Sequence, residues 1–353
     1  MRLAITLVMA VAVLAVAQAT AAPPPSEPPR PLLVPLTPSG PQACPPPGGA
    51  PASSPGQTSP PSKVPVVRID WRTDLAAALA EAARTGRPVL IYFHADWCQP
   101  CRLMDGATFV NRAVAAYIGQ HFVPVKVDDT RETSAVSKKY EVRIYPSLLL
   151  LSAAGEPLHM VLFPRTAAEL YPILQKMTAL PPLIDAQKRA PEDLEANFRL
   201  GEAWAGLDHF RRAEPHLARV VQMDPRNERG RLVQARLMLA VVPLEDGDSA
   251  QAIKNLRQFI EEFKDSPQAP TALYAVGAIL MQDGKLQEAR RVFEDVRTRF
   301  PRDAKAYEAD KAIDAIDARL PVLRGSGAAA TEGGKAGAAE NKSESRRGDK
   351  PAP

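Results

Sequence analysis

Between residues 66 and 180, short apolar runs alternate with segments whose apolar positions recur every three or four residues. The apolar runs are bounded by proline, glycine or polar residues, which is typical of buried strands. They predict strands at 88–94, 123–128, 146–152 and 157–163. The periodic segments predict helices at 73–86, 101–106, 111–122, 132–140 and 166–177. Strands interleaved with helices, followed by a hairpin and a last helix, predict a three-layer α/β domain over residues 66–180.

Local signals mark several of these boundaries. Gly86 can end the first helix in a left-handed conformation, and Asn111 is a suitable N-cap for a later one. Thr166 and Glu169 have the spacing of a capping box, which predicts a helix start at that point. Pro172 lies inside the same segment, so we expect this helix to be kinked or to start later.

Beyond residue 190 the strand pattern stops, and residues 191–320 carry helical periodicity throughout. Within this region an internal repeat is visible, in which equivalent residues are separated by the same offset of 76 positions. The equivalent pairs are Gly201/Gly277, Ala213/Ala289, Leu217/Phe293, Val220/Val296 and Pro225/Pro301. Two units of about 34 residues would leave about eight over, and the stretch "VVPLEDGDS" in the middle copy can hold that insertion.

These features resemble the tetratricopeptide repeat, a helix–turn–helix unit. Small residues such as Gly201 and Ala213 let two helices pack closely, and Pro225 ends the second helix. The resemblance implies an all-α solenoid over 191–320 whose concave surface binds a protein partner.

The composition of the two ends differs from that of the domains. Residues 1–22 combine Arg2, an apolar run and small residues that fit an A-x-A cleavage site, so they predict a signal peptide. An uncleaved anchor is the alternative, but the run is shorter than the ~20 residues that span a bilayer. Residues 23–65 contain 17 of the 36 prolines and predict a disordered linker. Residues 321–353 predict a disordered tail.

Export changes the interpretation of charge and cysteine content. The protein is expected to be secreted and periplasmic, with no membrane span after signal cleavage. The formal net charge of +4 is spread over residues of both signs with no long basic block, so nucleic acid is not an expected partner. Of the three cysteines, Cys44 lies in the proline tract without an evident partner. The other two form the sequence "ADWCQPCR" and can persist as a disulfide outside the cytoplasm.

Three interpretations of this cysteine pair are open: a metal clip, a structural staple and a redox-active pair. Zinc requires a second pair or suitably spaced histidines, and the sequence has neither. A disulfide that closes so small a loop restrains the unfolded chain little. The pair follows a strand and opens a helix, where backbone N–H groups stabilise a thiolate at Cys98. Cys101, one turn later, is then placed to attack a mixed disulfide at Cys98, so redox chemistry is favoured.

Two segments together resemble the thioredoxin superfamily: "YFHADWCQPC" at the strand–helix junction and "IYPSLLLL" about 45 residues later. The resemblance implies that Cys98 and Cys101 form the redox-active disulfide. It also implies that Pro146 is a cis-proline which, with Trp97 and Tyr145, binds an extended substrate. No organic cofactor and no metal are expected.

Two departures from ordinary thioredoxin are evident. Gln99 stands where the dipeptide between the cysteines usually has glycine, and Tyr92 replaces the buried acid six residues before the first cysteine. His94 could titrate near neutral pH, or it could simply pack beneath the active-site loop. We therefore keep His94 outside the catalytic set.

The leading hypothesis is a periplasmic thiol–disulfide oxidoreductase, most simply a disulfide reductase fed by an external thiol electron donor. Its protein substrate carries a disulfide, and its helical repeats recruit a protein partner. The alternative is an envelope scaffold in which the repeats carry the function and the redox domain is accessory.

Overall fold

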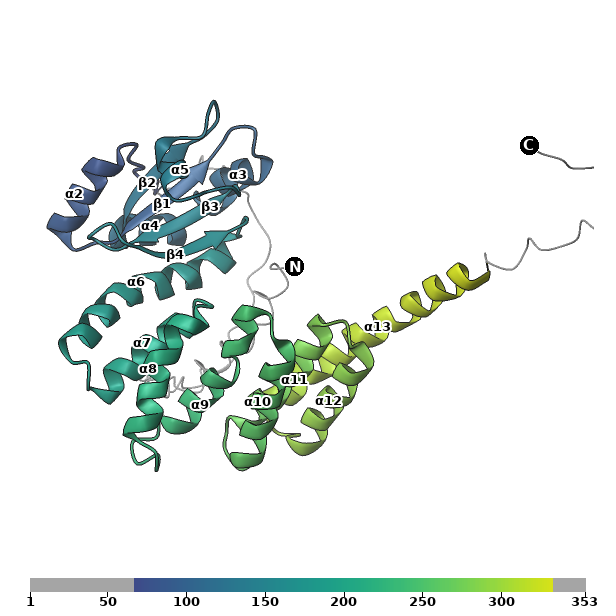
Figure 1. Ribbon diagram of the computed structural model, residues 1–353. Coiled ribbons are helices and arrows are strands. Elements are labelled where there is room, and N and C mark those ends of the chain that lie inside the picture. Colours follow the sequence, from purple (N-terminus) through teal and green to yellow (C-terminus); the bar gives the residue numbers. More distant parts are fainter. Residues whose placement is uncertain (1–66, 333–353) are drawn as a thin grey trace, which may run out of the picture. The chain divides into compact units, whose positions relative to one another are not determined.

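The computed structural model describes residues 67–332, with side chains up to residue 319. The expected signal peptide, linker and Cys44 lie outside the described residues. The described residues form two compact units, which divide between Ala190 and Pro191 (Figure 1). Among the described residues, no helix is long and apolar enough to cross a membrane.

The first unit is built on a four-stranded sheet in the order β2-β1-β3-β4. The central strand β1, Val89–His94, pairs in parallel with β2, Val123–Asp128, and antiparallel with β3, Ser147–Leu151. The hairpin partner of β3 is β4, Pro157–Leu162. All six residues of β1 are buried, because helices cover both faces of the sheet. The predicted strands and their hairpin are confirmed.

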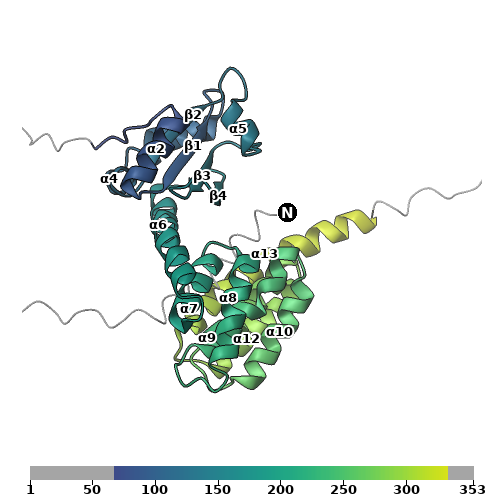
Figure 2. The same ribbon diagram turned by 60° about the vertical axis from the view of Figure 1, so that its left-hand side comes forward.

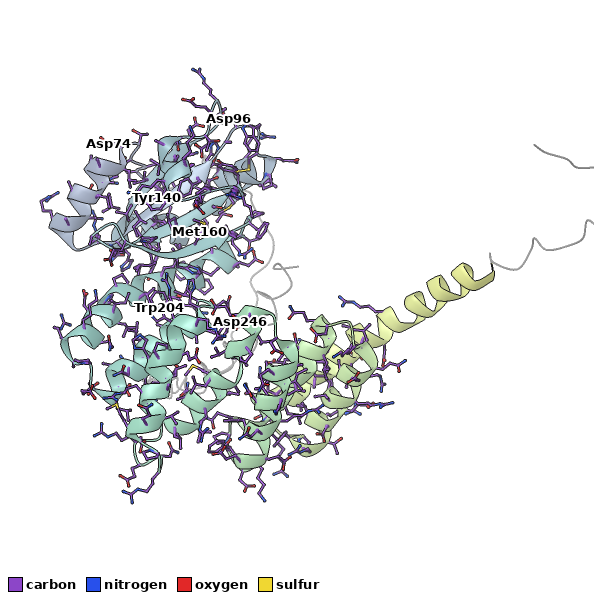
Figure 3. All side chains as sticks on the ribbon, in the orientation of Figure 1. Asp74, Asp96, Tyr140, Met160, Trp204 and Asp246 are labelled. Carbon is purple, nitrogen blue, oxygen red and sulfur yellow. A yellow bond between two sulfur atoms is a disulfide. The ribbon has the colours of Figure 1, made fainter. Side chains whose placement is uncertain are left out.

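Alternate residues of β1 face different helical layers. Val89, Ile91 and Phe93 pack with Ala78 and Ala82 of α2, and Tyr140 and Met160, labelled in Figure 3, flank this cluster. The opposite face is covered by α4 and α6, which contact each other. The predicted three-layer α/β arrangement is therefore confirmed. The helices of this unit are α2 (Leu75–Thr85), α3 (Gln99–Leu103), the π-helix η1 (Met104–Thr108), α4 (Arg112–His121), α5 (Ala135–Lys139) and α6 (Ala167–Arg189).

The predicted helix boundaries rest on the expected caps. Asn111 accepts hydrogen bonds from the first backbone N–H groups of α4, and Gly86 ends α2 with a φ of 70°. Thr166 and Glu169 form a complete capping box, so α6 begins directly after Thr166. Of the two outcomes expected from Pro172, a kink or a later start, the later start is therefore wrong. Figure 2 shows α6 as one continuous helix, which runs past residue 180 to Arg189.

The second unit is all-helical, as predicted. Its helices are α7 (Leu194–Ala205), α8 (Phe210–Met223), α9 (Leu232–Ala240), α10 (Ser249–Glu262), α11 (Ala269–Gln282), α12 (Leu286–Arg299) and α13 (Ala304–Glu332). Consecutive helices α7/α8 and α11/α12 pack as pairs. The insertion expected in the middle copy is present, because a 3-10 helix, Val242–Asp246, lies between α9 and α10.

The two equivalent glycines mark the closest approach within their helix pairs. A Cβ atom at Gly201 would lie 2.7 Å from Cδ2 of Leu217, and one at Gly277 would lie 2.7 Å from Cε1 of Phe293. Real Cβ atoms essentially never approach that closely, so a larger residue at either site would force the neighbouring side chain to move. The same packing contact therefore occurs twice, at positions that are 76 residues apart in the sequence.

The last helix differs from the expected boundary of the tail. Composition predicts disorder from residue 321, yet the backbone of α13 remains helical to Glu332. The stretch 328–330 is three consecutive alanines, which favour helix more than any other residue. Residues 333–353 lie outside the described part of the chain.

Candidate active site

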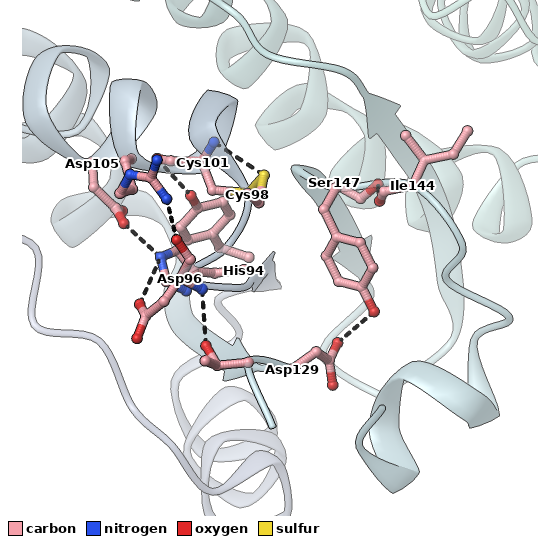
Figure 4. Close-up of a disulfide and its surroundings, with 12 residues drawn as sticks. His94, Asp96, Cys98, Cys101, Asp105, Asp129, Ile144 and Ser147 are labelled. Carbon is pink, nitrogen blue, oxygen red and sulfur yellow. Dashed lines mark hydrogen bonds and ion pairs between the residues drawn. A yellow bond between two sulfur atoms is a disulfide. The ribbon is translucent and has the colours of Figure 1, made fainter. Parts of the chain in front are cut away.

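The cysteine pair lies where β1 gives way to helix (Figure 4). Cys98 is the N-cap of α3 and is joined by a disulfide to Cys101, with 5.3 Å between the Cα atoms. The Sγ atom of Cys98 accepts the backbone N–H of Cys101 at 3.2 Å. Because a thiolate is a better acceptor than a thiol, this bond favours the ionised form of Cys98 after reduction.

The helix that the pair opens begins two residues before the predicted stretch 101–106 and changes type within it. α3 has only five residues and continues directly into the π-helix η1, which contains Asp105. The individual N–H of Cys101 therefore carries the stabilisation of the Cys98 sulfur, since so short an α-helix has only a small dipole. Wider π turns often occur at functional sites, and here the turn holds an acidic side chain near the disulfide.

The structure brings the five predicted site residues together. Cys98 is 4% exposed and Cys101 is fully buried, whereas Trp97 is 62% exposed at the surface beside them. Tyr145 packs against the cluster of Ala95 and the two cysteines, and its ring lies 5.5 Å from that of Trp97. The Tyr145–Pro146 peptide bond is cis, as the resemblance implies. Only a small part of the disulfide, flanked by aromatic rings, is thus open to a partner.

A buried carboxylate that sequence analysis missed fixes Tyr145. Asp129, at the end of β2, is 4% exposed and accepts a hydrogen bond from the Tyr145 hydroxyl at 2.9 Å. The backbone N–H of Ser134 and the hydroxyl of Ser137 donate to the same carboxylate. Burial and the neighbouring Asp129 raise the pKa of Tyr145 to about 12, so its hydroxyl stays a donor. An acid directly after a strand that borders β1 is the signal that could have identified it.

Behind the disulfide, a second polar group occupies the place where thioredoxin has its buried acid. Tyr92 is fully buried and donates a hydrogen bond from its hydroxyl to the carbonyl of Cys101 at 3.2 Å. Burial, and then the charge of Asp105, raise the pKa of Tyr92, so it is neutral at physiological pH. Asp105 of the π turn is thus an acidic neighbour of Tyr92, with a side chain that is 30% exposed.

His94 is buried beneath the loop and also makes an ion-pair contact. Its Nε2 atom lies 3.0 Å from Oδ2 of Asp105, and Nζ of Lys126 lies 3.1 Å from the same oxygen. The sequence singled out His94 but not Asp105 or Lys126. These three residues come from β1, the π turn and β2, so only the folded arrangement reveals the group.

Comparison with known proteins agrees with this geometry. The thioredoxin-like family matches residues 70–153, and the tetratricopeptide repeat matches residues 237–304, which include the middle copy. The Thioredoxin-like protein slr0233 of Synechocystis sp. is 32% identical over 93 residues, which make up 26% of this chain and 84% of that protein.

Two further similarities cover the same domain. The Thiol:disulfide interchange protein DsbD of Ralstonia nicotianae is 30% identical over 103 residues, 28% of this chain but only 17% of DsbD. The solved C-terminal domain of Neisseria meningitidis DsbD in its oxidised form is 21% identical, with 30% of this chain and 97% of that domain covered and a TM-score of 0.28.

The family match, the disulfide at the strand–helix junction and the cis peptide bond before Pro146 identify a thiol–disulfide domain, and the helical repeats imply protein binding. The chain therefore belongs to the thioredoxin-like family, with its thioredoxin-like domain followed by a tetratricopeptide-repeat region.

Proposed function

We propose that this protein is a protein-disulfide reductase of the bacterial periplasm. The observation that carries the proposal is the Cys98–Cys101 disulfide at the start of a helix, where Cys98 is 4% exposed next to the exposed Trp97. The similarity to a thiol:disulfide interchange protein supports the same class of reaction.

The reaction cycle uses the two sulfurs in sequence. The thiolate of Cys98 attacks one sulfur of the substrate disulfide, and the other substrate sulfur leaves as a thiolate. Cys101 then loses its proton and attacks Cys98, which releases the second substrate thiol and restores the Cys98–Cys101 disulfide. An external dithiol donor reduces this disulfide again and becomes a disulfide itself.

Location and partner recruitment belong to the same proposal. The apolar run and A-x-A site within residues 1–22 favour export, where protein disulfides persist. The helical repeats would hold a protein partner on their concave surface, as stacked helix pairs do in other repeat proteins.

A trapping experiment tests this function against the scaffold alternative. In a Cys101→Ser variant, the mixed disulfide at Cys98 cannot be resolved, so we expect adducts with substrate proteins on non-reducing gels. A Cys98→Ser variant is the matched control and should trap nothing. If Cys101→Ser forms no adduct in cells and the wild-type protein does not reduce insulin, the repeats alone carry the function and the reductase proposal fails.

A further inference from the structure

His94 combines deep burial with an unused hydrogen-bonding atom. The residue is 5% exposed, and its Nε2 atom faces the Asp105 carboxylate at 3.0 Å. Its other ring nitrogen, Nδ1, is buried without a hydrogen-bond partner among the described residues. In a neutral ring that donates Nε2–H to a carboxylate, Nδ1 is a bare acceptor. A buried acceptor without a donor costs free energy.

Three carboxylates and one lysine lie around the imidazole ring. Asp105 approaches Nε2 from the π turn, and Oδ1 of Asp96, in the loop after β1, lies 3.9 Å from the same atom (Figure 4). Asp128, at the end of β2, has a pKa lowered mainly by its hydrogen bonds from Thr130. Lys126 of β2 brings a positive charge to the same region and is paired with Asp105.

The imidazole is also close to the redox pair along the chain and through Tyr92. His94 directly precedes Ala95, whose carbonyl accepts the backbone N–H of Cys98 at 3.0 Å. The ring centroids of Tyr92 and His94 lie 5.8 Å apart, and the Tyr92 hydroxyl is bound to the Cys101 carbonyl. A negative charge that appears on the pair is therefore felt at His94 through a buried region in which water screens charge poorly.

We propose that His94, held by Asp105, takes up a proton when the Cys98–Cys101 disulfide is reduced and releases it when the disulfide forms again. This inference rests on the proposed function, because it requires that the pair cycles. A dithiol donor gives two electrons and two protons and becomes a disulfide. The S–S bond breaks, Cys98 becomes a thiolate, Cys101 becomes a thiol with one proton, and His94 holds the second proton.

This coupling makes reduction more sensitive to pH than it would be without the histidine. The reduced form binds two protons more than the oxidised form, one on Cys101 and one on His94, whereas a pair with a Cys98 thiolate and no histidine would bind only one. Falling pH therefore favours reduction, and each coupled proton changes the equilibrium constant by up to tenfold per pH unit, which is about 30 mV for a two-electron couple.

The test compares the wild-type chain with His94→Gln across the ordinary titration range of histidine, about pH 5.5 to about 8.5. The amide of Gln can still donate to Asp105 but binds no proton. Each protein is equilibrated with glutathione in a Cys44→Ser background, and the thiols of the pair are counted by alkylation. Oxidation of two glutathione thiols also releases two protons, so we expect the wild-type equilibrium constant to stay nearly level with pH. The constant of His94→Gln, which keeps only one of these protons, should rise by up to tenfold per pH unit.

His121→Gln is the matched control, because His121 ends α4 at the opposite end of the strands, next to Val123. It should follow the wild-type profile. Parallel profiles for wild type and His94→Gln would overturn the coupling. Should His94→Gln not fold, the wild-type protein decides by NMR. One of its five histidines should titrate at higher pH in the reduced than in the oxidised form, and identical titrations of all five overturn the proposal.

The two proposals can fail separately. A chain that does not reduce insulin but shows the histidine-dependent profile contradicts the reductase function alone. A chain that reduces insulin but shows parallel profiles contradicts the proton coupling alone.

Discussion

Replacing Tyr145 with Phe removes one hydroxyl from the wall of the disulfide site and leaves the aromatic ring. In the wild type that hydroxyl donates to the buried carboxylate of Asp129, and the ring packs against the cysteine cluster and Trp97. The change therefore separates the hydrogen bond that positions the ring from the apolar contact that the ring makes.

The expected magnitudes follow from these contacts. A hydrogen bond to a charged group contributes about 1.5–3 kcal/mol, and Asp129 keeps two donors, from Ser134 and Ser137. We expect the free energy of unfolding to fall by about 1.5 kcal/mol, at the lower end of that range. A ring that must be ordered on binding costs about 0.5–1.5 kcal/mol, which corresponds to about a two- to tenfold rise in KM for a protein disulfide. kcat should change little, because both cysteines remain.

Insulin reduction under steady-state conditions, together with urea unfolding, measures both effects. Ser137→Ala is the control, because it removes another donor from the same Asp129 carboxylate and leaves every atom of Tyr145 in place. It should lower stability by a similar amount and leave KM unchanged. If both variants raise KM equally, or if neither does, Asp129 does not act on the substrate site through Tyr145.

Two further predictions concern the helical repeats. Gly277→Ala places a methyl group against Phe293 and should lower the free energy of unfolding by about 1–3 kcal/mol. The control Gly119→Ala, in open space on α4, should raise it by up to about 1 kcal/mol. Urea unfolding measures both, and equal effects of the two variants would contradict the close contact at Gly277. Burial raises the carboxyl pKa of Glu202 above that of the unfolded chain, so the wild-type protein loses stability as pH rises above about 4.3. Glu202→Gln, which can keep a hydrogen bond with Gln234, should be the more stable protein at pH 8 and have no advantage below about pH 4; an advantage that does not depend on pH would refute the assignment.

The sequence predicts those parts of the fold that depend on the pattern of apolar residues and on the internal repeat. β1 and β3 are buried on both faces and therefore read as uninterrupted apolar runs. The equivalent glycines at 201 and 277 reveal the repeat, because one packing contact constrains both positions. Residues 321–332 show the limit of composition, since alanine is common both in unstructured tails and in helices.

The sequence predicts the site residues whose type and position are distinctive by themselves, and it misses those whose role depends on partners elsewhere in the fold. Cys98, Cys101 and Pro146 are recognisable because each is an unusual residue type at a fixed place. Asp105 and Asp129 are ordinary acids whose roles depend on partners from other elements; Asp129 meets Tyr145 across 16 residues. The contact between Asp105 and His94 also requires the π turn after α3, which no local pattern in "CRLMDG" announces.

The central claim is that the Cys98–Cys101 pair reduces protein disulfides, and the rate of insulin reduction in the presence of a thiol donor tests it most directly. The account predicts that wild-type protein accelerates this reaction over the donor alone and that Cys98→Ser removes the acceleration. A wild-type rate equal to that of the donor alone, or full activity in Cys98→Ser, would contradict it.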